Sequence, residues 1–372
     1  METGDSRRSR CGQLVISLYF HIPFCSRKCP YCHFYVVPNK PLFHQVLTEG
    51  LKLEWETIQS HLAGKEITSI YFGGGTPALF PHGIGEILNW LKLPPDCEIT
   101  VESNPEECTM ALLQTFREMG VNRLSLGVQS LDDRALLSLE RIHSASKAKE
   151  AIHLAKSADF SNVSIDLMYD LPDQTLASFA YTLEQVAELD IDHVSLYNLT
   201  IESHTAFYKR PPKQPAAEIS LQLLEMATTK LEAMGLTRYE ISAFAKQGKQ
   251  SRHNLGYWTG RPFLGLGPSA FSFWEGERFR NVANLQRYTA RLREGKSPID
   301  FREALPFPQN INERLAVRLR LLEGAETTEL PDTTLSVIEK LTQQGLLHKE
   351  GSHIQLTPRG LLLYDTVAAE LI

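Results

Sequence analysis

The segment Leu14–Phe34, LVISLYFHIPFCSRKCPYCHF, decides the fold. Six of its first seven residues are apolar, and Val15 and Ile16 are β-branched, which predicts a short buried strand. Three cysteines follow directly, at Cys25, Cys29 and Cys32, with the spacing C-x3-C-x2-C. Because ligands bind beyond the carboxyl ends of the strands in a parallel α/β sheet, this loop stands where such a fold places a reactive site.

Cysteines crowded into one loop of a chain without a secretory signal predict a metal or cluster site. Iron–sulfur clusters are held by thiolates, and with three thiolates one iron of a [4Fe–4S] cubane stays open for an external ligand. S-adenosylmethionine (SAM) can chelate that iron through its amino and carboxylate groups. Zinc is the alternative, since His21 or His33 would complete a Cys3His set. The remaining cysteines are expected to be small buried residues: Cys11, Cys97 and Cys108.

Composition limits the class of protein. The 372 residues are 42% hydrophobic and 22% charged, which is typical of a soluble globular protein long enough for a large core. The net charge of −6 argues against broad nucleic-acid binding, which needs a basic face. We find no signal peptide and no apolar run of about 18 residues or more that would span a membrane. The sequence therefore predicts a cytoplasmic protein.

The first two hundred residues alternate short apolar runs with helical stretches. Strands alternating with helices imply parallel pairing, because a right-handed crossover needs a helix-length connection. Six such units are too few for an eight-stranded barrel, so a partial barrel or an open sheet remains. The predicted strands are 14–20, 67–72, 98–102, 123–128, 162–167 and 193–197, and the predicted helices are 44–61, 83–91, 110–119, 132–139, 146–156 and 176–189.

The pattern changes after about residue 210. Residues 211–216 (PPKQPA) indicate a linker, 217–234 fit an amphipathic helix, and 239–274 are dense in aromatic residues and glycine. Helices and a hairpin with Gly351 in its turn follow, which predicts a small α+β winged-helix-like domain. We therefore expect three parts: a barrel at 1–210, an extension at 211–305 and the C-terminal domain at 306–372.

Polar residues follow each predicted strand. The second strand is followed by Gly73-Gly74-Gly75-Thr76, whose backbone can approach a ligand closely. Carboxylates such as Glu102 and Asp166 can accept hydrogen bonds from the ribose hydroxyls or ammonium of SAM, and the planar fork of Arg141 can pair with its carboxylate. Strand ends of a barrel converge on one face, so these residues are candidates for one site.

The cysteine loop resembles the radical SAM signature, and Phe20–Cys25 (FHIPFC) resembles more narrowly the HemN/HemW family. That family contains anaerobic coproporphyrinogen III dehydrogenases and haem chaperones, and the resemblance covers nearly the whole chain. It implies a partial (βα)6 radical SAM barrel with a [4Fe–4S] cluster on the three cysteines. It also implies a SAM site lined by Tyr19, Gly74, Gly75, Thr76, Glu102, Gln129, Arg141 and Asp166, with Tyr31 beside the cluster and Phe271 as a further contact. The family often has glycine where this chain has Asp170.

A second motif is His253-Asn254-Leu255-Gly256-Tyr257-Trp258. By itself it is compatible with a hydrogen-bonded core histidine. Imidazole is also a good axial ligand for haem iron, and flat aromatic side chains pack well on a porphyrin. The segment resembles the H-N-x-x-Y-W motif of HemW-type haem chaperones, which implies haem as a further cofactor with His253 as its ligand.

Two departures separate the branches of the family. The dehydrogenases carry a fourth cysteine where this chain has Phe34, and a long segment before the first strand, where only 18 residues precede Tyr19 here. Both departures favour a haem chaperone that passes haem to a haem-requiring client protein. That client could be a membrane protein. Resemblance to the haem chaperones also implies a homodimer. The alternatives are a dehydrogenase that converts propionates of coproporphyrinogen III to vinyl groups, a radical SAM methylase, and a zinc-stabilised binding module.

Overall fold

The computed structural model describes residues 14–372, so Cys11 lies outside the described residues. Its centre is a twelve-stranded sheet with the order β14-β13-β12-β11-β1-β4-β5-β6-β7-β8-β10-β9. The six predicted strands are confirmed and pair parallel with one another in chain order. They are β1 (Val15–Ile22), β4 (Glu66–Gly74), β5 (Glu98–Ser103), β6 (Arg123–Gln129), β7 (Asn162–Tyr169) and β8 (His193–Asn198).

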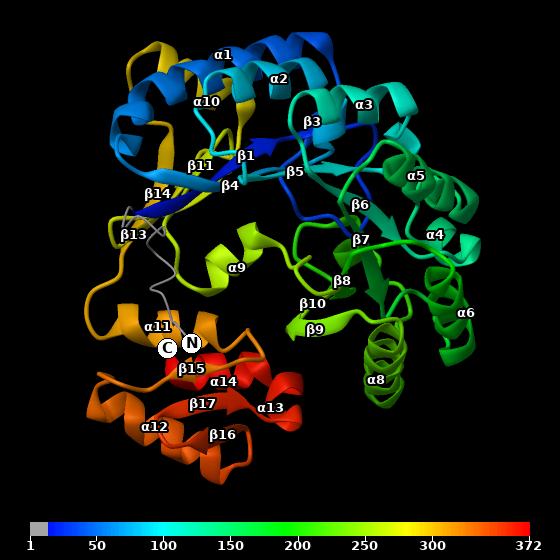
Figure 1. Cartoon of the computed structure of the whole chain (residues 1–372), viewed down its shortest axis with the longest axis vertical. Coiled ribbons are helices and arrows are strands. Elements are labelled where there is room, and N and C mark those ends of the chain that lie inside the picture. Colours follow the sequence, from blue (N-terminus) through cyan, green and yellow to red (C-terminus); the bar gives the residue numbers. More distant parts are fainter. Residues whose placement is uncertain (1–13) are drawn as a thin grey trace.

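The six predicted helices are also confirmed, and they cover the outer side of the curved sheet (Figure 1). Several begin at a residue whose side-chain oxygen accepts a hydrogen bond from a first-turn amide, as Ser144 does from Lys147 and Thr175 from Ser178. These caps fix where each helix starts after a strand-end loop. The helices are α1 (Pro41–Ile58), α2 (Pro81–Asn89), α3 (Met110–Glu118), α4 (Asp133–Ser138), α5 (Ala145–Ser157) and α6 (Leu176–Ala187).

The two faces of the sheet differ in chemistry. In β1, the side chains of Ile16, Leu18 and Phe20 are fully buried in the main hydrophobic core. Since successive side chains of a strand point to opposite faces, Ser17 and Tyr19 point the other way, and Ser17 accepts a hydrogen bond from Ser69 of β4 (2.8 Å). The alternation therefore gives an apolar face toward the helices and a polar face inside the curve.

Residues 237–304 extend this sheet at both ends, which the sequence did not predict. Strand β11 (Phe263–Leu266) pairs parallel with β1, and an antiparallel series follows: β12 (Phe271–Trp274), β13 (Glu277–Asn281) and β14 (Ile299–Ala304). At the opposite end lie β10 (Ala243–Ala245) and β9 (Thr237–Glu240). The first strand is thus an interior strand, covered by pairing on both sides.

Four helices connect these strands. They are α7 (Ala206–Lys209), α8 (Ala217–Ala233), α9 (Arg252–Trp258) and α10 (Leu285–Arg293). Helix α9, which carries the HNLGYW motif, contacts β1 and β4 of the sheet and α11 of the C-terminal part. Figure 1 shows it between the curved sheet and the C-terminal elements, while α10 packs against α1 on the outer side.

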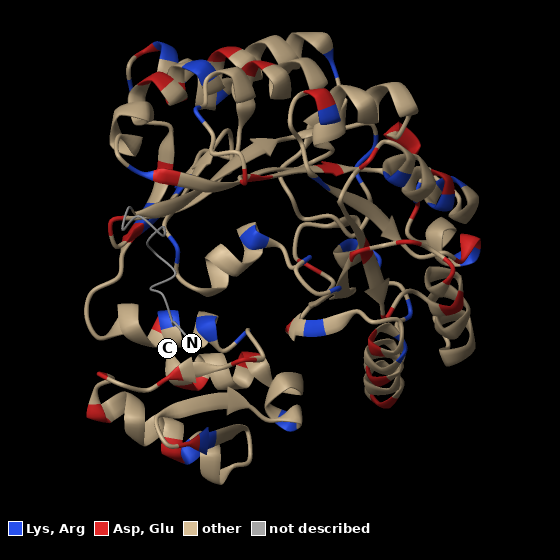
Figure 2. Ribbon diagram, viewed as in Figure 1, with Lys and Arg blue, Asp and Glu red and all other residues tan. Residues whose placement is uncertain are grey.

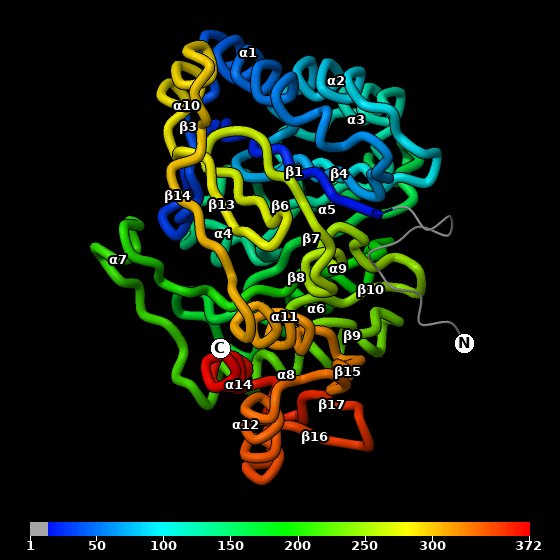
Figure 3. The backbone as a smooth tube through the Cα atoms, turned by 90° about the vertical axis from the view of Figure 1, so that its left-hand side faces the viewer, coloured from blue at the N-terminus to red at the C-terminus, as the bar shows by residue number. Residues whose placement is uncertain are grey.

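The C-terminal part has a hydrophobic core of its own, which includes Leu319, Ile338 and Ile354. The predicted hairpin is present, with Gly351 at a φ of 60° in its turn. In Figure 3 this part lies below the sheet, with α7 projecting to one side. Its elements are α11 (Gln309–Arg318), β15 (Ala325–Glu326), α12 (Asp332–Gln343), β16 (Leu347–Glu350), β17 (His353–Leu356), α13 (Pro358–Leu362) and α14 (Tyr364–Leu371).

Acidic and basic residues are interleaved along the outer helices (Figure 2), in keeping with the small net charge of the sequence. None of the helices between residues 14 and 372 is both long and apolar enough to cross a lipid bilayer.

Candidate functional site

The cysteine loop leaves the carboxyl end of β1 and is closed by backbone pairing. Strand β2 (Phe24–Cys25) pairs parallel with β3 (Val37–Pro38). The Val37 amide donates to the Pro23 carbonyl (2.8 Å), and the Cys32 amide to the Cys29 carbonyl (3.1 Å). These hydrogen bonds bring the end of the loop back beside its beginning, next to the end of β1. The three cysteines therefore belong to one short loop held by backbone hydrogen bonds.

The three thiols are free and partly exposed. Burial raises the pKa of the Cys25 thiol to about 11 and also raises the pKa of Cys32, so a bound cation is needed to hold them as thiolates at neutral pH. Among residues 14–372, no three His, Cys, Asp or Glu side chains are gathered as for a single metal ion. In a cubane each thiolate binds a different iron, so the cysteine donor set fits a [4Fe–4S] cluster.

A chain of hydrogen bonds runs from one side of the loop to the other. The Thr76 hydroxyl lies 3.7 Å from Cys25 Sγ and accepts from Asn104 Nδ2 (3.0 Å). Asn104 Oδ1 in turn accepts from Arg141 Nη2 (2.7 Å), and Arg141 Nη1 donates to Cys29 Sγ (3.3 Å). Thr76 and Arg141, which the sequence placed at the SAM site, therefore each contact a cysteine directly, and Asn104 joins them to each other.

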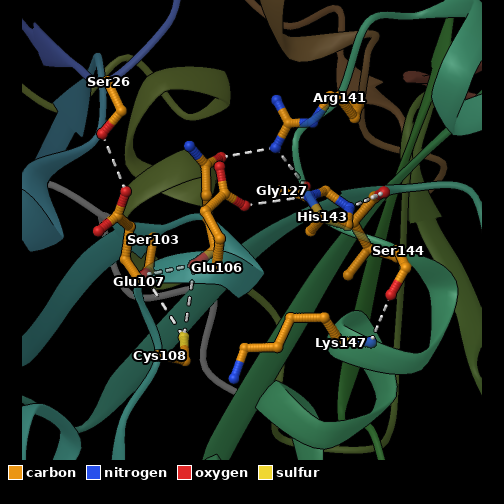
Figure 4. A network of polar contacts seen from close by, with 12 residues as sticks. Ser26, Ser103, Glu106, Glu107, Cys108, Gly127, Arg141, His143, Ser144 and Lys147 are labelled. Carbon is orange, nitrogen blue, oxygen red and sulfur yellow. Dashed lines mark hydrogen bonds and ion pairs between the residues drawn. The ribbon is translucent and has the colours of Figure 1, made fainter.

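Asn104 was missed by the sequence-based prediction, although it stands at the end of the third predicted strand, before Pro105. Figure 4 shows the same region from close by, with Arg141 next to the Gly127 carbonyl to which Nη2 also donates (2.9 Å). Close by, the buried His143 is hydrogen-bonded to Glu106 Oε2 and to the Val128 carbonyl, each at 3.1 Å. The guanidinium group of Arg141 is thus fixed on several sides.

The side chains of Asn104, Gln129 and Arg141 all approach the Cα of Gly127. A Cβ atom on Gly127 would lie 3.1 Å from both Asn104 Oδ1 and Gln129 Nε2, and 3.5 Å from Arg141 Nη2. The structure therefore brings together Gln129 and Arg141, as the sequence predicted. Tyr31 adjoins them, since its phenol neighbours both Arg141 and Cys29.

The glycine turn after β4 admits no side chain at two positions. Gly74 has a φ of 112°, which only glycine adopts readily. A Cβ atom on Gly75 would lie 2.5 Å from the Phe24 carbonyl oxygen. The turn is therefore pressed against the start of the cysteine loop.

Two predicted carboxylates lie on the polar inner face. Glu102 accepts hydrogen bonds from the Tyr71 hydroxyl (2.7 Å) and the Gly74 amide (3.1 Å). Burial raises the pKa of Glu102 to about 7 and that of Asp166 to about 6, and the positive charge of buried Arg123 opposes both shifts. These groups can accept hydrogen bonds from hydroxyl or ammonium donors of a ligand on this face.

The departure at Asp170 has a structural explanation. Its φ is 60°, in the left-handed region where the family's glycine is at ease and where aspartate is tolerated better than most residues. Its carboxylate also accepts hydrogen bonds from Asn198 and Ser220. Aspartate can therefore occupy this left-handed position, with its carboxylate hydrogen-bonded.

A cavity of about 550 Å³ opens beside the cysteine loop, which is within the range of about 300–1,000 Å³ usual for ligand pockets. The sheet, α9 and α11 all contribute to its wall. Eight of its residues are Phe, Tyr or Trp, and three are arginines. The lining consists of Tyr19, His21, His33, Phe34, Tyr35, Tyr257, Trp258, Gly260, Arg261, Phe263, Ser269, Phe271, Phe273, Arg278, Leu305, Asn310, Glu313, Arg314 and Val317.

Two residues predicted to touch SAM, Tyr19 and Phe271, line this cavity. Tyr19 joins the two regions, because its ring also stacks on Tyr71 with the centroids 6.3 Å apart, and Tyr71 bonds Glu102. Phe271 is 45% exposed, and its ring lies against that of Phe301, which does not line the cavity. The cavity and the polar inner face are therefore adjacent.

His253 is buried, with 1% of its surface exposed. Its Nδ1 lies 3.0 Å from Ser69 Oγ, and its Nε2 lies 2.8 Å from the Tyr257 hydroxyl. Burial lowers its pKa to about 3, so the ring is neutral. Both nitrogens are occupied within the protein, and it is the following residues of the motif, Tyr257 and Trp258, that reach the cavity.

Comparison with known proteins agrees with this geometry. The radical SAM superfamily model matches residues 19–186, and the HemN C-terminal domain model matches residues 305–363. Heme chaperone HemW of Bacillus subtilis is 31% identical over 371 residues, which cover 94% of this chain and 97% of that protein. Heme chaperone HemW of Escherichia coli is 33% identical over 371 residues, covering 95% and 97%. The chain belongs to the HemN/HemW family of radical SAM proteins.

Among solved structures, coproporphyrinogen III oxidase (HemN) of Escherichia coli has the same fold, with a TM-score of 0.84 at 24% identity over 96% of this chain and 89% of that one. The predicted partial radical SAM barrel with its C-terminal domain is confirmed. Membership in the radical SAM superfamily implies a [4Fe–4S] cluster and SAM as cofactors of this HemN/HemW family member, and it removes the zinc-stabilised module from consideration.

Proposed function

We propose that this protein is a haem chaperone, which binds haem beside a radical SAM site and passes it to haem-requiring proteins. The observation that carries the proposal is the aromatic cavity next to the cysteine loop. Haem is a flat macrocycle with two propionates, and aromatic walls with arginines among them suit its faces and its acid groups. The full-length similarity to proteins named heme chaperone HemW supports the same function.

In this proposal, Cys25, Cys29 and Cys32 hold the cluster and the strand-end residues hold SAM. When bound, the cluster and SAM together supply one-electron chemistry. Arg141 fixes Cys29 by donating to its sulfur and, with Gln129, bounds the space above Gly127. Gly74 and Gly75 leave room for backbone contact with SAM, and Glu102 and Asp166 accept hydrogen bonds from its polar groups.

Three segments of the chain have different roles in this function. The first segment, 1–210, contributes the barrel from residue 14 onward and holds cluster and SAM. Residues 211–305 supply α9 and the β11–β13 wall of the cavity, and residues 306–372 complete that wall through α11. The separate hydrophobic core of the last segment supports this division. We further propose a cytoplasmic setting and a homodimer, with a haem-accepting client protein as partner. The unpaired thiols of Cys97 and Cys108 suit a reducing compartment.

The test uses protein with its cluster reconstituted anaerobically. Ferric haem is titrated in and followed by difference absorbance against the same protein without haem, and the complex is then mixed with a haem-free haem protein. We expect stoichiometric binding followed by transfer to the acceptor. Absence of haem binding by cluster-loaded protein would contradict the proposal.

The dehydrogenase alternative is tested in the same preparation. Coproporphyrinogen III, SAM and a reductant are added, and the tetrapyrroles are separated by chromatography. We expect the substrate to remain unchanged, because Phe34 occupies the position of the extra cysteine of the dehydrogenases. Accumulation of protoporphyrinogen over many turnovers would make the protein an enzyme instead.

A further inference from the structure

The three histidines around the aromatic cavity differ in whether their ring nitrogens are available. His21 lines the cavity but is buried. Its Nδ1 is bonded to the Tyr19 hydroxyl and its Nε2 to the Tyr35 carbonyl, both at 3.0 Å. His253 lies behind the wall, and its nitrogens are bonded to Ser69 and Tyr257. Neither ring can bind iron without giving up a buried hydrogen bond.

His33 is different. It lies between Cys32 and Phe34, is exposed, and lines the cavity. Within the part of the chain that the structure describes, neither of its ring nitrogens has a hydrogen-bond partner. Its ring packs on that of Phe34, with the centroids 4.6 Å apart. His33 is therefore the cavity histidine whose lone pair is open to a ligand.

His253 has a different position in the fold. Its backbone amide donates to Glu98 Oε1 (2.8 Å), so both its main chain and its ring are tied to strands of the barrel. Its other ring nitrogen holds the hydroxyl of Tyr257, and Tyr257 with Trp258 forms part of the cavity wall. The contacts of His253 are those of a residue that positions helix α9.

We propose that His33 is the axial ligand of haem iron in the cavity, and that His253 is a positioning residue for the aromatic wall. This inference rests on the proposed haem chaperone function. The bond forms by donation of a lone pair from neutral imidazole to iron, with no change of oxidation state and no proton released. Because His33 adjoins Cys32, one loop would then carry a cluster ligand and a haem ligand side by side.

The experiment compares His33→Ala and His253→Gln with the unsubstituted chain, each with its cluster reconstituted. His153→Ala, an exposed histidine on α5, is the matched control. Ferric haem is added, and difference absorbance and electron paramagnetic resonance report the axial ligand. We expect His33→Ala to lose the imidazole-ligated signature and to bind haem at least tenfold more weakly. Added free imidazole should restore the signature.

We expect His253→Gln to keep the imidazole signature, with weaker binding because the wall is less well held. Loss of the signature in His253→Gln together with its retention in His33→Ala would overturn the inference while leaving the haem chaperone function standing. If the unsubstituted chain binds no haem, the proposed function and this inference fall together. Circular dichroism of His253→Gln separates loss of a ligand from loss of the fold.

Discussion

The cysteine loop and the aromatic cavity meet at His33 and Phe34, but they are assembled in opposite ways. The three thiols come from eight consecutive residues. The cavity wall comes from residues between Tyr19 and Val317, contributed by the first strand, α9, the sheet extension and α11. A local site needs one loop to fold correctly, whereas a distributed site needs several distant segments packed together, so substitutions should affect the two separately.

The largest expected effect is on the local site. Replacing Cys29 by serine should reduce iron and sulfide from about four per chain to near zero, since a hydroxyl is a poor substitute for a thiolate on iron. The affinity for haem should change by less than about tenfold, because no cavity wall residue is altered. Iron and sulfide analysis after anaerobic reconstitution measures the first quantity, and haem titration the second.

Cys97→Ser is the matched control, since Cys97 is a buried thiol outside the loop. It should retain the cluster. If Cys29→Ser kept a full complement of iron, the assignment of the three cysteines to the cluster would be wrong.

The next effect concerns the distributed site. Phe271→Ala should weaken haem binding roughly 10- to 100-fold, because it removes an aromatic side chain that lines the cavity. Iron content should be unchanged. The measurement is a haem titration with cluster-loaded protein.

Phe301→Ala serves as its control. Phe301 packs against Phe271 with ring centroids 6.5 Å apart but does not line the cavity. Equal weakening by the two substitutions would show that the loss comes from general disturbance of the sheet extension.

A smaller effect, on the affinity for SAM, is expected from a substitution at Arg141, where the polar inner face meets the cysteine loop. Arg141→Lys keeps the positive charge but replaces the two Nη atoms, which reach Cys29 on one side and Asn104 and the Gly127 carbonyl on the other, by a single nitrogen. We expect SAM to bind about tenfold more weakly, while the cluster still assembles. Equilibrium binding of SAM to reconstituted protein measures this, with Arg134→Lys on α4 as the control. Unchanged SAM affinity would contradict the role given to Arg141.

The last prediction concerns stability and the buried hydrogen bonds that join α1 to the sheet extension and α10. Buried Glu54 of α1 accepts hydrogen bonds from the Tyr288 hydroxyl (2.5 Å), the Gly267 amide (2.8 Å) and Asn281 Nδ2 (2.6 Å). Glu54→Gln replaces one acceptor by a donor, so we expect the free energy of unfolding to fall by about 1–3 kcal/mol. Urea unfolding measures it, with exposed Glu56→Gln on the same helix as the control.

The same residue gives a pH dependence of defined sign. Burial raises the pKa of Glu54 to about 7 from an ordinary value of 4.5. The folded state therefore holds a proton that the unfolded state releases, and this contribution to stability is complete below pH 4.5 and is lost as the pH rises through 7. The advantage of the unsubstituted chain over Glu54→Gln should shrink over that range by on the order of 2–3 kcal/mol. A constant difference would contradict the shift.

Prediction from sequence succeeded where the determining information is local. The six parallel strands, their helices and the C-terminal hairpin were predicted from apolar periodicity and turn residues. Cysteine spacing is likewise a property of a few neighbouring residues, and so is the glycine turn at Gly74. Strands β11–β14 were missed, because short aromatic and glycine-rich segments become strands only when an existing sheet offers them an edge.

The sequence by itself determined the parallel barrel, the thiol loop and the polar strand ends, since each follows from side-chain period or from residues a few positions apart. Only the tertiary structure decided that Asn104 connects Thr76 with Arg141 and that a cavity lies between β1, α9 and α11. It also decided that both ring nitrogens of His253 are hydrogen-bonded within the protein, whereas those of His33 are available to a ligand. Those facts depend on which distant segments pack together, and burial and hydrogen-bond partners are not encoded in any single stretch of the chain.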